Sequence, residues 1–237
     1  MNNDVVHLSE ILKLIDKIKE SKNDKAIEIL QEKDTRKTFF EMLAGSLRVY
    51  YLGLDSIFIA NKINHSNFTF NEFEVPHIER FGWLLDKKYL EDVYLPTLKM
   101  NLINDCWVCF ESTLRDIFYV KEHIKYKNHI WEIYTDKIFD SRDINITKDN
   151  KKFLGFLGHC RNAMHNNSIH DPKNEIDKYN NWEYTIGEKF KLEKSKKIKF
   201  MTKEVVLELI NKLSDVALDM WKNLNYPGFI PDRYNSK

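Results

Sequence analysis

One short stretch of this chain carries residues whose types and spacing suit chemistry on a phosphodiester: His159–Asn167. Arg161 and His165 are four residues apart, so in a helix both project from one face about one turn apart. Asn162 and Asn166 form a second such pair beside them. An arginine keeps its charge and donates to two phosphate oxygens, and a histidine titrates near neutral pH. We therefore predict that His165 moves a proton, that Arg161 stabilises negative charge, and that Asn162 and Asn166 position these groups.

The chemistry that this set predicts is cleavage of RNA without a metal. RNA carries its own nucleophile, the 2′-hydroxyl, so the protein must supply proton transfer and charge stabilisation. The products would be a 2′,3′-cyclic phosphate and a 5′-hydroxyl. No cofactor is required by such a mechanism, and we expect none.

A helix must position these residues. Apolar residues recur at threes and fours from Asn150 to Met164, which predicts a helix that ends at the motif. Thr147 or Asp149 can cap its start. Gly155 and Gly158, one turn apart, permit a close backbone approach, either by another helix of the same chain or by a second subunit.

A plainer interpretation is that Arg161 and His165 only finish the helix, where cations interact well with its C-terminal dipole. Asn166 and Asn167 would then be ordinary C-caps. His159 and His170 are the nearest alternatives for the catalytic histidine. His159 would point elsewhere on the helix, whereas His170 is predicted to lie in a loop from which it could move into the site.

The motif resembles the signature of the HEPN superfamily, in which an arginine and a polar residue precede a histidine near a helix end. Three residues separate Arg161 from His165 here, and the usual signature has four. The stretch Phe110–Arg115 is similar to a Phe-Glu-x-x-Leu-Arg pattern in the helix that precedes the motif helix. The resemblance covers about half of the chain, roughly Leu95 to Asn223.

The resemblance implies a helical bundle and, in many members, a metal-independent ribonuclease of phage defence or toxin–antitoxin systems. It also implies a homodimer formed through the motif-helix region, and an antitoxin or defence-system protein as a possible partner. Glu111 and Arg115 would line the substrate cleft beside Arg161; the alternative is a solvated helix ion pair. The alternative function is a catalytically inactive HEPN-like module that binds RNA, a nucleotide or a partner protein.

Composition favours helices, because the chain has only seven glycines and five prolines. The formal net charge of +1 excludes a generic polyanion binder, so any RNA contact must be local. We expect a cytoplasmic protein that does not enter the membrane, since no apolar stretch is long enough to span one. Cys106 and Cys109 fit small buried side chains better than a metal site. The histidines are scattered, so a metal hydrolase is a weak third possibility.

The chain is predicted to be mainly α, with an N-terminal helical region (1–90) packed on an HEPN-like domain (91–237). Helices are expected at 8–20, 26–32, 35–62, 77–89, 91–123, 124–139, 150–164 and 202–223.

Alternating residues from Trp182 to Phe200 predict a small β-hairpin or three-stranded flap, with one apolar face and one lysine face. Such lysines often only protect a sheet edge from aggregation. They could instead bind the RNA backbone. The candidate substrate-binding lysines are Lys189, Lys191, Lys197 and Lys199.

Overall fold

The structure is a computed structural model of the chain. It describes residues 2–65, 87–122, 146–166, 168–171, 181–186, 188–224 and 228–232. The predicted helix 124–139 and most of the predicted helix 77–89 lie outside these residues.

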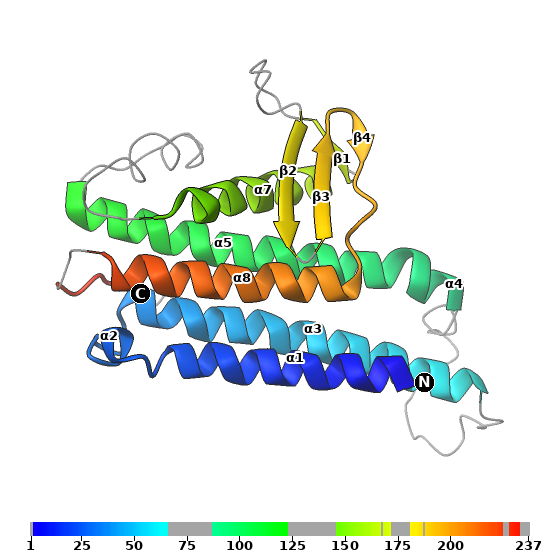
Figure 1. The fold of residues 1–237 in the computed structure, drawn as a ribbon. Coiled ribbons are helices and arrows are strands. Elements are labelled where there is room, and N and C mark those ends of the chain that lie inside the picture. The colour runs from blue at the N-terminus through cyan, green and yellow to red at the C-terminus, as the bar shows by residue number, and fades with distance from the viewer. Residues whose placement is uncertain are drawn as a thin grey trace.

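The protein is mainly helical, as predicted. Its long helices lie side by side with nearly parallel axes, and each runs antiparallel to the long helix before it in the described chain (Figure 1). The helical elements are α1 (Asn2–Ser21), α2 (Lys25–Glu28), α3 (Thr35–His65), α4 (Lys87–Tyr89), the π-helical turn η3 (Leu90–Tyr94), α5 (Leu95–Glu122), α7 (Lys148–His165) and α8 (Lys203–Lys222). Among the described residues, no helix is both long and apolar enough to cross a lipid bilayer.

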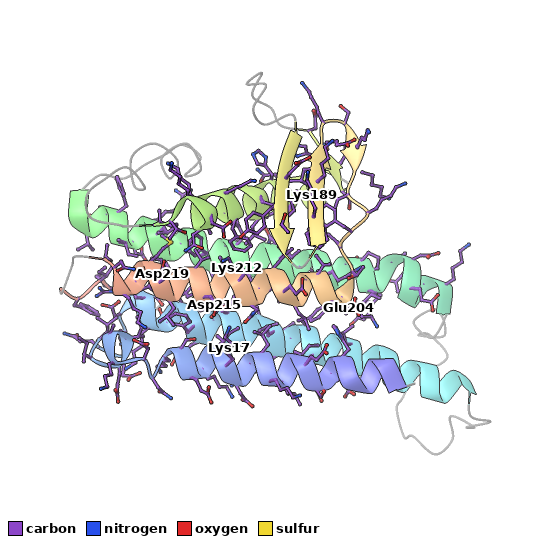
Figure 2. The ribbon with its side chains drawn as sticks, in the orientation of Figure 1. Lys17, Lys189, Glu204, Lys212, Asp215 and Asp219 are labelled. Carbon is purple, nitrogen blue, oxygen red and sulfur yellow. The ribbon has the colours of Figure 1, made fainter. Side chains whose placement is uncertain are left out.

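A single hydrophobic core joins the helices before residue 66 to those after residue 94. At its centre, Phe39 of α3, Phe110 of α5 and Trp221 of α8 pack with ring centroids 6.0–6.1 Å apart. On the surface, Lys17 of α1 forms a 2.7 Å ion pair with Asp215 of α8 (Figure 2). Side chains from both ends of the sequence therefore stabilise one bundle.

A buried ion pair attaches the C-terminal segment to the start of α3. Asp34 and Arg36 form a 2.7 Å salt bridge with side chains only 0% and 3% exposed. Arg36 also donates to the carbonyl of Gly228, and the backbone N–H of Ile230 donates to Asp34. Each charged group is thus paired and hydrogen-bonded, which burial requires.

Helix α7 lies between α5 and a β-hairpin that crosses it (Figure 1). Thr147 caps its N-terminus, because its side chain accepts a hydrogen bond from the N–H of Asn150. Gly155 and Gly158 are buried within the chain itself. This burial fits the alternative in which the glycines pack against other elements of the same chain.

The hairpin consists of β2 (Asn181–Ile186) and β3 (Glu188–Glu193), paired antiparallel. A second small sheet pairs β1 (Ile169–His170) with β4 (Lys196–Lys197). The apolar hairpin face packs on α7, where the ring of Tyr184 lies 5.4 Å from that of Phe153. The hairpin is therefore confirmed, but the predicted loop after the motif contains a short strand.

Candidate active site

The antiparallel packing of α5 and α7 brings one further residue to the motif, Asn104 of α5. Its side-chain oxygen Oδ1 lies 3.3 Å from Nε of Arg161 and 2.8 Å from Nε2 of His165. Arg161 and His165 stand one turn apart on α7, as their spacing predicts. A single amide oxygen therefore holds both side chains.

This shared oxygen determines which nitrogen of His165 carries a proton. Arginine only donates hydrogen bonds, so Asn104 must turn its oxygen, and not its NH₂ group, toward Arg161. The same oxygen faces His165, so Nε2 must donate to it. In the neutral imidazole, Nδ1 then has no proton and is available as a base.

The surroundings of His165 favour its neutral form. Partial burial lowers the pKa of His165, and the positive charge of Arg161 lowers that pKa further. The side chain nevertheless remains exposed. His165 is therefore an accessible proton acceptor at neutral pH.

Arg161 keeps donors for a ligand. Its Nε bonds to Asn104, and its Nη1 donates to Oδ1 of Asn162 at 3.1 Å. A guanidinium has five N–H groups, so three stay available for phosphate oxygens. Asn162 is exposed and orients the guanidinium, which is the positioning role predicted for it.

Asn166 acts mainly on the backbone. It is the C-cap of α7, and its N–H donates to the carbonyl oxygens of Ala163 and Asn162. Its side chain donates to the carbonyl of Ile169 at 3.4 Å. Asn166 therefore ends the helix and supports the following turn, while Asn104 supplies the amide that holds His165.

Glu111 and Arg115 form the expected i, i+4 ion pair on α5, at 2.7 Å. Asn104 precedes Glu111 by seven residues, so both lie on one side of the helix, about 10 Å apart. The Glu111–Arg115 ion pair therefore lies on the same side of α5 as Asn104, the side that faces the motif. Sequence analysis missed Asn104 because nothing in one sequence indicates which turn of α5 meets Arg161.

The alternative histidines are buried together. His159 and His170 are 8% and 2% exposed, and their rings meet edge to face at 5.2 Å. Burial lowers the pKa of His159 to about 4. His170 was expected in a loop, and it lies instead in strand β1, which packs against α7.

The lysine face of the hairpin is largely neutralised by glutamates. Lys189 pairs with Glu183 at 2.7 Å, and Lys191 pairs with Glu193 at 3.0 Å. The predicted lysine face of the hairpin therefore carries glutamates that pair with its lysines. Lys197 and Lys199 lie beyond it and are exposed.

The cysteines are buried, which suits small apolar side chains. Burial raises the pKa of the Cys109 thiol to about 11, and it raises that of Cys106 well above its usual value. Across the described ranges, no group of three or more His, Cys, Asp or Glu side chains could hold a metal ion. The polar side chains at the site (Asn104, Arg161, Asn162 and His165) include no carboxylate and one cation, a composition typical of an anion site.

Comparison with protein-family models found no match, and comparisons with curated proteins and with solved structures also found none. The function is therefore argued from the site.

Proposed function

We propose that this protein is a metal-independent endoribonuclease with a HEPN-like fold. The observation that carries the proposal is the pair of hydrogen bonds by which Asn104 holds Arg161 and His165 together. The pair combines a fixed cation with an accessible histidine whose basic nitrogen is defined. The resemblance of the motif to the HEPN signature supports the same function.

In the proposed reaction, Nδ1 of His165 takes the proton of a 2′-hydroxyl, and O2′ attacks the adjacent phosphorus. Available N–H groups of Arg161 stabilise the additional negative charge on the phosphoryl oxygens. A P–O2′ bond forms and the P–O5′ bond breaks, which leaves a 2′,3′-cyclic phosphate. The departing 5′ oxygen takes a proton from water or from a second His165 across a homodimer.

The biological setting that we propose is phage defence or toxin–antitoxin regulation in the cytoplasm. A homodimer through the motif-helix region would bring together two copies of the end of α7, where Asn162, His165 and Asn166 are exposed. A protein antitoxin or a defence-system protein would be its further partner.

The test is cleavage of mixed cellular RNA in EDTA by the wild-type protein, Arg161→Ala and His165→Ala. We expect His165→Ala to lower the rate by roughly 10²–10⁴-fold, the usual contribution of a positioned acid–base group. Arg161→Ala should lower it by roughly 10²–10³-fold, the usual cost of removing a donor that stabilises developing charge. Neither substitution should change the circular dichroism spectrum. Arg48→Ala is the matched control, because Arg48 is an exposed arginine on α3. Helix α3 lies apart from α7 in the bundle (Figure 1). The RNA ends should resist phosphatase until the cyclic phosphate is opened with acid.

Two results would contradict the proposal. Cleavage that stops in EDTA would indicate a metal hydrolase. Intact RNA with every variant, together with a partner or RNA that co-purifies, would favour the catalytically inactive binding module.

A further inference from the structure

The end of α7 leads directly to Lys197 and Lys199, two exposed lysines of the basic region for which the described residues supply no acidic partner. The N–H of Ile169 donates to the carbonyl of Asn166 at 2.8 Å and closes a turn. Ile169 in turn pairs with Lys197 across the β1–β4 sheet. A turn of this kind and an antiparallel pair together place the Cα of Lys197 within about 12 Å of that of Asn166.

The four candidate lysines divide into two classes. Lys189 and Lys191 lie on β3 and form ion pairs with glutamates of the hairpin (Figure 2 labels Lys189). Lys197 and Lys199 are exposed, and no ion pair is recorded for either within the described residues. A phosphate that binds a lysine of the first class must displace a carboxylate, whereas the second class requires no such exchange.

The side chains of Lys197 and Lys199 face away from the core. Residues directly opposite in an antiparallel pair point to the same side, so Lys197 shares the exposed side of Ile169. Ile198 and Phe200 alternate with the two lysines and are partly buried against the core. The two cations therefore project together from the edge that adjoins the end of α7.

We propose that single-stranded RNA runs from Arg161 and His165 across the end of α7 to Lys197 and Lys199. The exposed Asn162 and Asn166 lie along this path, and the two lysines bind phosphates that flank the scissile one. Lys189 and Lys191 do not contact the strand. This proposal rests on the proposed ribonuclease function and names the surface that holds its substrate.

The experiment measures RNA binding as a function of salt in the full chain carrying His165→Ala, which prevents cleavage. The probe is a fluorescein-labelled single-stranded RNA of mixed sequence, followed by anisotropy. Two double variants are compared, K197A/K199A and K189A/K191A. They are matched, since each lowers the formal net charge of +1 by two and removes two surface lysines.

We expect K197A/K199A to make the slope of log Kd against log salt shallower by about 1.4, because each phosphate contact with a single strand contributes about 0.7. K189A/K191A should leave the slope unchanged. An equal change in both variants, or a larger one in K189A/K191A, would overturn this path while the cleavage result stands. Absence of both RNA binding and RNA cleavage in the wild-type chain would overturn the path and the ribonuclease together.

Discussion

Replacing Asn104 by aspartate tests the hydrogen bond that organises the site. The substitution puts a negative charge where Oδ1 now lies, 2.8 Å from Nε2 of His165. Opposite charges about 4 Å apart attract by about 1 kcal/mol even in water, and one pKa unit corresponds to about 1.4 kcal/mol. At this shorter distance and with partial burial, the pKa of His165 should rise by about one unit.

The assay is the pH dependence of RNA cleavage, combined with an NMR titration of His165. Cleavage requires neutral His165, so the rate decreases as the pH falls below the pKa of His165. This acidic limb of the profile should move about one pH unit higher in Asn104→Asp. Asn104→Ala removes a hydrogen bond worth about 1 kcal/mol, so it should lower the rate about fivefold. Its acidic limb should not move toward higher pH.

Asn101→Asp is the matched control for the added charge. Asn101 is exposed on α5, one turn before Asn104. Its carboxylate would be farther from His165, so the limb should move much less. Superimposed profiles for the wild-type protein and Asn104→Asp, in a protein that still requires His165, would refute the inferred hydrogen bond.

Further outcomes follow from the charges and the buried groups. Arg161→Gln should raise the pKa of His165, since it removes a neighbouring cation; a His165 NMR titration that moves downward would contradict this. Arg36→Met should cost about 3–5 kcal/mol in urea unfolding, because it leaves the buried carboxylate of Asp34 without its cation; a loss below 1 kcal/mol would mean that this pair is unimportant. His159 has a folded-state pKa of about 4 against an ordinary value of 6.5, so below pH 6.5 only the unfolded chain gains its proton. Protonation of His159 in the unfolded chain should therefore lower the free energy of unfolding by about 3 kcal/mol from pH 7 to pH 4. The variant His159→Leu should not show this contribution to the pH dependence.

Much of the local structure was determined by the sequence itself. Apolar residues at threes and fours indicated the helix that became α7, and Thr147, one of the two expected caps, caps its start. These features depend on neighbours within a turn or two, because helix periodicity and capping act over a few residues. The i, i+4 placement of Arg161 and His165 is local in the same sense.

The tertiary structure decided what meets the motif. Asn104 lies 57 residues before Arg161, and the packing of α5 against α7 alone makes the two adjacent. Strand β1 has two residues, too few for a periodic pattern, and it exists because Lys196 and Lys197 pair with it. That pairing is also what confines His170.

The charge on the hairpin was decided in the same way. The register places Glu183 opposite Lys191 and diagonally next to Lys189, so acidic and basic side chains of the two strands become partners. A sequence specifies helices and caps because their interactions are short-range. Which polar groups form the site, and which lysines remain available, depends on helix packing and strand register, which only the assembled chain fixes.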